Sequence, residues 1–197
     1  KVKEQHIISY DPTDETRKLD DQIVRIDAYD ANGRATQQHI TNRAPNDLTI
    51  LSIQDITLSY YAAGPYAGKV KEQHIISYDP TDETRKIDDQ IVRIEEYYSG
   101  GKDDGKVHIQ TVESFDPTGA FTQAIDKQRI TIDEYYHGEQ NNGKVHIQTV
   151  ETLDPTGKIT EAIDKQRITI EEYYYDGKDH GKVHIQTVET FDPTGTY

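Results

Sequence analysis

The sequence predicts an all-β protein whose tandem hairpins, about 38 residues each, form an open and extended antiparallel array. Three observations support this prediction. Residues 143–157 recur almost unchanged at 105–119 and at 181–195. Segments rich in β-branched residues and tyrosine alternate with turn-forming residues, which is typical of strands. No segment has the apolar periodicity of an amphipathic helix.

Glycines open the repeats at spacings of 35, 37, 38 and 38 residues: Gly33, Gly68, Gly105, Gly143 and Gly181. The first repeat begins at Lys1 without its glycine. We therefore predict five complete units at residues 1–32, 33–67, 68–104, 105–142 and 143–180, and a partial unit at 181–197. Because the chain opens inside a repeat and without Met, we expect it to be a piece of a longer array.

Each unit opens with a segment that we predict to be a strand, such as residues 1–10 or 106–115. In the second of these, Val107 and Ile109 share one face of a regular strand, whereas Val112 falls on the other. A bulge or twist near Gln110 and Thr111 would bring the apolar residues together.

A proline follows each opening segment: Pro12, Pro45, Pro80, Pro117, Pro155 and Pro193. Five of the six follow an aspartate, and the later units continue with Thr-Gly. Proline presets a turn dihedral, aspartate accepts hydrogen bonds from turn amides, and glycine tolerates the left-handed conformation. Asp-Pro-Thr-Gly therefore predicts a tight hairpin with a three-residue loop, with Gly157 left-handed.

The return half of each unit has two apolar parts, for example residues 159–163 and 166–174. Ile163 and Ile168 are five positions apart, so a straight strand would place them on opposite faces. We therefore predict a kink or bulge at residues 163–166 and at the equivalent 125–128. Polar, glycine-containing loops then lead to the next unit, at residues 98–105, 136–143 and 175–181.

A single unit has too few apolar side chains to fold alone, so neighbouring units must share a sheet. A closed propeller does not fit, because the chain both starts and ends with an opening strand. Two separate β-sandwiches would need a break in composition, and the sequence has none. A β-solenoid is the alternative to the open array, although it would stack Lys106 on Lys144 and Glu113 on Glu151 at strand spacing, which is unfavourable.

Composition limits the function classes. The net charge of -14 disfavours nucleic acid and anionic membranes as partners. No apolar run approaches the ~20 residues of a membrane span, so membrane insertion is not expected. Cysteine is absent, which excludes disulfides, thiolate nucleophiles and cysteine-based metal sites.

Two groups of side chains suggest metal chemistry. His180 and His184 are four residues apart, but the loop-to-strand context favours a solvated strand face over a helical metal site. The acidic loops offer oxygen atoms that suit Ca²⁺, but EF-hand spacing is absent and turn formation explains these residues: Asp103, Asp104, Asp176 and Asp179. We assign no metal-binding or cofactor-binding residue, and Ca²⁺ remains the one candidate ion.

Acidic and aromatic residues recur together at residues 95–98, 133–136 and 171–174. Such edges suit a sugar or a basic surface, but cross-strand packing of tyrosine explains them without a ligand. No nucleophile elbow, phosphate loop or His-Glu-x-x-His motif is present. Because a catalytic pocket needs one unique geometry and these residues recur, we predict no catalytic residues and no enzymatic activity.

Two short stretches resemble known repeat families. Residues 175–182 are similar to hairpin repeats of the MORN type, and residues 29–34 resemble one YD repeat of the RHS kind. Each covers less than a tenth of the chain, and the period of about 38 residues departs from both families. No function follows from either resemblance.

We therefore predict an extracellular or cell-surface structural protein that builds a fibre, stalk or surface layer by strand-to-strand association with itself or with neighbouring repeats. The partial unit at 181–197 supports this hypothesis, because it supplies an opening strand without a return strand. The alternative is an adhesin or carbohydrate-binding module whose tyrosine-rich edges bind cell-surface polysaccharide.

Overall fold

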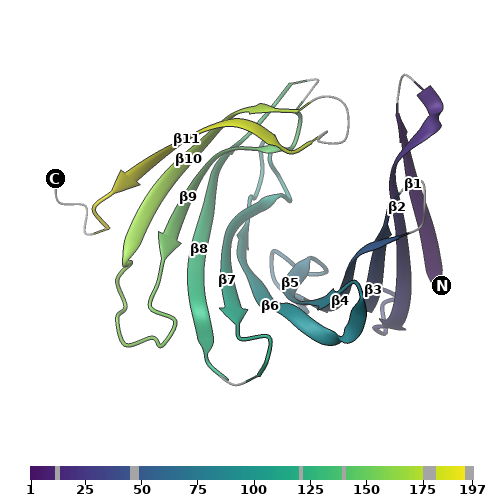
Figure 1. Cartoon of the computed structure of the whole chain (residues 1–197). Coiled ribbons are helices and arrows are strands. Elements are labelled where there is room, and N and C mark those ends of the chain that lie inside the picture. The colour runs from purple at the N-terminus through teal and green to yellow at the C-terminus, as the bar shows by residue number, and fades with distance from the viewer. Residues whose placement is uncertain (12–13, 45–48, 120–121, 139–140, 175–180, 194–197) are drawn as a thin grey trace. The chain divides into compact units, whose positions relative to one another are not determined.

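The computed structural model describes residues 1–11, 14–44, 49–119, 122–138, 141–174 and 181–193. These residues contain strands and turns and no helix, which confirms the predicted fold class (Figure 1). Eleven strands follow one another: β1 (Glu4–Asp11), β2 (Asp14–Tyr29), β3 (Ala35–Arg43), β4 (Ile50–Tyr60), β5 (Val70–Asp79), β6 (Asp82–Tyr97), β7 (Val107–Phe115), β8 (Ala124–Tyr135), β9 (Val145–Thr152), β10 (Asp164–Tyr173) and β11 (Val183–Phe191).

The strands form one open antiparallel sheet in which the spatial order equals the chain order, from β1 to β11. The predicted hairpin array is therefore confirmed, and the solenoid alternative is wrong. A solenoid requires parallel strands, whereas each connection here reverses the chain. At the openings of the units, Gly33, Gly68, Gly105, Gly143 and Gly181 all have φ between 83° and 85°, a conformation that favours glycine.

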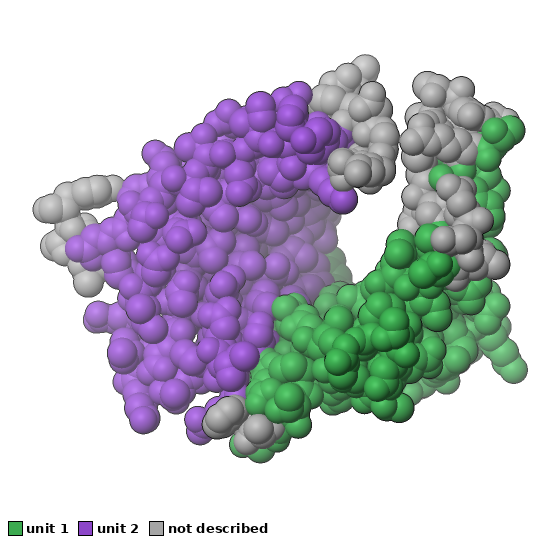
Figure 2. Space-filling model, in the orientation of Figure 1, with its two compact units in different colours: residues 1–91, 115–122 green, residues 92–114, 123–197 purple. Residues whose placement is uncertain are grey.

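The strands fall into two compact units, which are coloured separately in Figure 2. Unit 1 comprises residues 1–91 and 115–122, and unit 2 comprises residues 92–114 and 123–197. This division does not follow the sequence repeats. The first residue of each later repeat instead lies in a loop between two hairpins, as Gly143 does between β8 and β9.

Few apolar side chains are buried in either unit. Unit 1 buries Val24 and Ile53, whereas unit 2 buries three pairs: Ile94 and Tyr97, Ile132 and Tyr135, and Ile170 and Tyr173. Most other strand residues are half-buried. The sheet therefore gains its stability mainly from cross-strand pairs and main-chain hydrogen bonds.

The paired Ile and Tyr residues are three positions apart, which in a regular strand would place them on opposite faces. Register shifts resolve this conflict. Opposite β9, Ile132 pairs with Gln148, Glu134 with Ile147 and Tyr135 with Val145. The extra residue therefore lies at Asp133, and a second irregularity lies at His146.

The bulge predicted near Gln110 and Thr111 has no counterpart in the next repeat. At the equivalent Gln148 and Thr149 the register is regular against both neighbouring strands. The irregularity lies two residues earlier, at His146, opposite the buried Tyr135 of the neighbouring strand.

The return half also differs from its prediction. Strand β10 begins only at Asp164, and Ile159 and Ile163 are exposed, so residues 159–163 belong to the loop. The three-residue loop is therefore wrong for this unit. No bulge lies at residues 164–166, because the register of β10 with β9 is regular from Asp164 to Thr169.

The shortest hairpin connection among the described residues lies in the sequence repeat at 68–104, which has Asp82 where later repeats have the turn glycine. There Pro80 and Thr81 alone connect β5 to β6, which is 16 residues long. Where Gly119 and Gly157 replace that aspartate, φ is 72° and 71°, so the predicted left-handed conformation of Gly157 is confirmed. The left-handed residue directs the chain into a longer loop instead of straight into a strand.

Three of the aspartates that precede turn prolines accept hydrogen bonds from turn amides, as predicted. The Asp154 carboxylate accepts hydrogen bonds from the amides of Thr156 and Ile159, both at 2.9 Å, and from the Thr156 hydroxyl. These bonds, from the hydroxyl foremost, lower the pKa of Asp154. Asp79 and Asp116 hold Thr81 and Thr118 in the same way.

Candidate functional site

Tyrosines at the ends of the return strands pack under lysines that directly precede the opening strands. The Lys106 ammonium lies 4.6 Å from the centre of the Tyr135 ring, and Lys144 lies at the same distance from Tyr173. The Tyr135 hydroxyl donates a 2.6 Å hydrogen bond to the Val107 carbonyl, and Tyr173 does the same to Val145. Burial raises the pKa of Tyr135 to about 12. These rings and hydroxyls are used within the sheet.

The second tyrosine of each pair connects one repeat to the next. The Tyr98 hydroxyl donates to the carbonyls of Ile132 and Asp133, at 2.6 and 3.1 Å. Tyr136 makes the equivalent bonds to Ile170 and Glu171. The acceptors lie at the bulges of the following return strands, where the ladder is irregular. Sequence reasoning missed this role, although the repeated Tyr-Tyr pair was its signal.

Histidines of unit 2 stack on these second tyrosines. The ring centres of Tyr98 and His108, Tyr136 and His146, and Tyr174 and His184 are 4.3, 4.3 and 4.2 Å apart. Each histidine Nδ1 also lies 3.0 to 3.3 Å from a glutamate oxygen: Glu96, Glu134 and Glu172. His184 therefore pairs with Glu172, and its proposed metal partner His180 lies outside the described residues.

Histidines of unit 1 occupy the other repeat position and pair with aspartates across the strands. His6 lies 2.8 Å from Asp21, His39 lies 2.8 Å from Asp55, and His74 lies 2.7 Å from Asp89. Asp21 is fully buried, and its second oxygen lies 3.9 Å from the Lys18 ammonium. These pairs fix neighbouring strands in register.

Charged residues form a cross-strand ladder in unit 2. Glu113 on β7 contacts Arg93 on β6 and, at 2.9 Å, Lys127 on β8. Burial would raise the pKa of Glu113, but hydrogen bonds from Arg93 and Lys127 outweigh burial and lower it. Glu151 on β9 similarly lies 3.2 Å from Lys165 on β10. The alternation of acidic and basic strands favours this strand order over like-charge stacking.

The acidic loop at Asp103 and Asp104 already has protein partners. The Asp103 carboxylate lies 2.7 Å from the Lys106 ammonium and 3.2 Å from His137, while Asp104 accepts a bond from the Gly100 amide. Asp176 and Asp179 lie outside the described residues. Within the part of the chain that the structure describes, no group of three or more histidine or acidic side chains is arranged to hold a metal ion.

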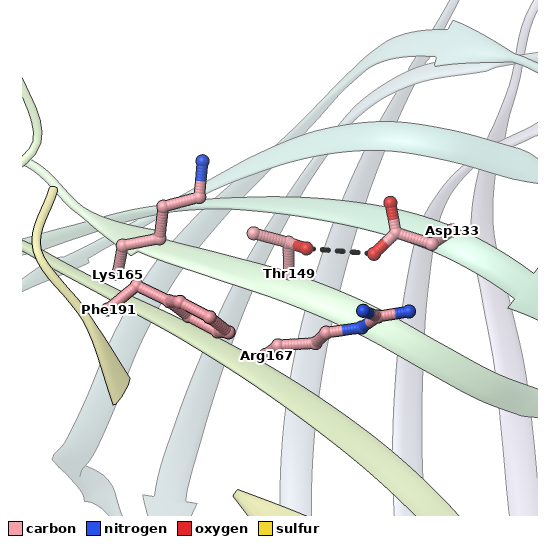
Figure 3. A pocket seen from close by; sticks show the side chains of 5 residues that line it. All are labelled: Asp133, Thr149, Lys165, Arg167 and Phe191. Atoms are coloured by element: carbon pink, nitrogen blue, oxygen red, sulfur yellow. Dashed lines mark hydrogen bonds between the residues drawn. The ribbon is translucent and has the colours of Figure 1, made fainter. Parts of the chain in front are cut away.

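A shallow depression of about 360 Å³ lies on unit 2, over four strands (Figure 3). It is lined by Asp133, Thr149, Lys165, Arg167 and Phe191. The Thr149 hydroxyl donates to Asp133 at 2.8 Å. In the preceding repeat, Arg129 lies 3.6 Å from Glu95. Asp133 is one methylene shorter than that glutamate, and the equivalent Arg167 makes no ion pair among the described residues.

The outer edges of the sheet are the remaining candidate site. In the strand order, β1 and β11 each have one neighbour, β2 and β10. The side chains of β11 are exposed up to Thr190, and its apolar residues Val183, Ile185 and Val188 are 38, 44 and 47% exposed. No proline interrupts β11, and Glu189 is its only carboxylate. These features are typical of an edge that accepts another strand.

No family model, curated protein or solved structure matches this chain. None of the described residues belongs to a helix long and apolar enough to cross a membrane.

Proposed function

We propose that the protein is a structural β-repeat protein that builds a fibre, stalk or surface layer by strand addition at the edges of its sheet. The observation that carries this proposal is the pair of outer strands, β1 and β11, each with one neighbouring strand among the described residues. An unpaired edge presents a row of free N–H and C=O groups, which another strand satisfies. The added strand comes from a second molecule or from a further repeat.

The use of the repeated side chains supports a structural role. In Tyr135 and Tyr173, both the ring and the hydroxyl make contacts within the sheet. The histidines are held by carboxylates, and these arrangements recur from repeat to repeat. Recurrence suits a building unit better than a catalyst, which needs one distinct constellation.

We also propose that the protein lies outside the cell or on its surface. Labelling of non-permeabilised cells would test this location.

Sedimentation velocity over a range of concentrations tests the association. We expect oligomers whose size grows with concentration. Replacing Val183, Ile185 and Val188 together with Lys should reduce them, because charges on an edge oppose strand addition. A matched control replaces three exposed apolar residues of interior strands with Lys: Leu51, Ile87 and Ile125. A monomer at all concentrations, or equal loss in both triple variants, would contradict edge association.

The second candidate function is carbohydrate binding, and the depression in Figure 3 favours it. The Phe191 ring and the cations Lys165 and Arg167, the latter without an ion pair among the described residues, suit an acidic sugar. The Asp133 carboxylate can accept hydrogen bonds from the sugar hydroxyls. Titration with soluble uronic-acid oligosaccharides should then show saturable binding that Arg167→Gln weakens. Equal binding by the Arg129→Gln control, or no binding, would argue against this candidate.

A further inference from the structure

The strand order restricts how two copies can join. Eleven strands follow one another, each antiparallel to the next, so the first and the last have the same sense in the order of the sheet. If copies joined head to tail, β11 of one would therefore lie parallel to β1 of the next. Parallel pairing occurs nowhere in this sheet and is slightly less stable per residue.

Like edges, in contrast, join in the antiparallel sense. A two-fold axis perpendicular to the sheet places β11 of one copy antiparallel to β11 of another and keeps corresponding faces on the same side. Such a contact is isologous, which is the commonest way for identical chains to associate. It extends the pairing mode that the chain already uses at every hairpin.

The residues of β11 suit pairing with themselves. Residues 183–188, Val-His-Ile-Gln-Thr-Val, have no Gly, Pro or carboxylate and are rich in β-branched residues. Short segments of this kind stack against identical copies. A two-fold axis places one residue opposite its own counterpart, and registers centred on Ile185 or Val188 pair apolar residues that are exposed in the single chain.

We propose that copies of this chain alternate in direction, joined β11 to β11 and β1 to β1 through antiparallel two-fold contacts. This inference rests on the proposed function and specifies which edges meet. The contact between β11 strands is the stronger one, because charged residues disfavour strand addition and β1 has an acidic residue at each end, Glu4 and Asp11. A fibre then grows by alternation of the two contacts.

Disulfide trapping tests this arrangement cleanly, since the chain has no cysteine of its own. Single-cysteine variants are made on β11 at residues 185, 186, 187 and 188 and on β1 at residues 5, 6, 7 and 8. Each variant tests the two-fold register that is centred on its own residue, so each set covers four successive registers. The control is Thr57→Cys, an exposed position on interior strand β4.

We expect one β11 variant, Ile185→Cys or Val188→Cys, to form covalent dimers alone, at roughly tenfold the yield of the control because pairing raises the local thiol concentration. One β1 variant should also dimerise alone, at higher protein concentration. Circular dichroism confirms that each variant remains folded, and four positions per strand guard against one disruptive substitution.

The other outcomes distinguish a failure of the alternating arrangement from a failure of strand addition itself. Cross-linking that appears only when a β1 variant is mixed with a β11 variant would overturn the alternating arrangement and leave strand addition standing. Yields at the control level for every variant and mixture, together with sedimentation as a monomer, would overturn both.

Discussion

Tyr135 shows how a single side chain connects several strands of this sheet. Its ring lies under Lys106 and meets Tyr98 edge-on, with ring centres 6.1 Å apart, while its hydroxyl bonds the Val107 carbonyl. It reaches this position only because the bulge at Asp133 turns it onto the face of Ile132. The alternation of apolar and polar residues in the sequence cannot reveal such a bulge when both faces of a strand are partly exposed to solvent.

Tyr135→Phe should lower the free energy of unfolding by about 1 kcal/mol, the usual net contribution of one hydrogen bond. Chemical denaturation measures this change. Tyr174→Phe is the matched control, since the Tyr174 side chain is exposed and its hydroxyl makes no hydrogen bond among the described residues. Equal effects of the two substitutions would contradict the role assigned to the Tyr135 hydroxyl.

The same tyrosine predicts alkaline sensitivity. Burial raises its pKa from 10.0 to about 12, so the folded state favours the neutral phenol. That contribution is fully present below pH 10 and is lost as pH rises towards 12. Denaturation midpoints measured across this window should fall less steeply in Tyr135→Phe than in the unmodified chain. Identical slopes would show that Tyr135 does not contribute to the loss of stability at alkaline pH.

Gly157 tests the turn. Because its φ is 71°, Gly157→Val should destabilise the protein by roughly 1 kcal/mol or more, since β-branched residues resist that conformation. Gly138→Ala is the control, because Gly138 lacks a left-handed φ and has open space around it. Thermal unfolding of the two variants measures the difference. An unchanged melting curve for Gly157→Val would contradict the expected backbone strain of valine at this position.

At the scale of elements, identical sequences can have different environments. Residues 1–18 and 69–86 are the same, yet β1 lies at the edge and β5 lies between two strands. Tyr10 is exposed, whereas Tyr78 is partly buried and bonds Asp55, and burial foremost raises its pKa. Strand type and hairpin order could thus be predicted from local sequence. The bulge position, the length of the loop after β9 and the partners of each histidine depend on neighbouring strands.

The cross-strand ladder of charged residues around Glu113 can be tested by a single substitution. Glu113→Gln should cost about 1 kcal/mol at neutral pH, because it removes a charge held by two cations. The folded-state pKa is lowered, so this stabilisation is present above the ordinary pKa of 4.5 and is lost as pH falls through the folded value. Acid titration of stability should therefore be flatter in the variant. Glu83 is exposed, and its side chain makes no ion pair or hydrogen bond among the described residues. Glu83→Gln should therefore leave the free energy of unfolding and its dependence on acid pH unchanged.

For the whole molecule, the charge of -14 and the acidic loops raise the question of cation dependence. Asp103 is already held by Lys106 and His137, so we expect a chelator to leave the unfolding midpoint and the sedimentation profile unchanged. Calorimetry with and without EDTA measures this. A lower midpoint in EDTA, restored by Ca²⁺, would show that an ion site had been overlooked.

The central claim is that the outer strands recruit further strands, and hydrogen exchange at two protein concentrations tests it most directly. Strand β11 carries at residues 183–190 the same sequence as β9 at 145–152, so β9 is an interior control with matched residues. We predict that amide protection in β11, and more weakly in β1, rises with concentration while β9 stays constant. Oligomers that form without added protection in either edge strand would contradict the claim.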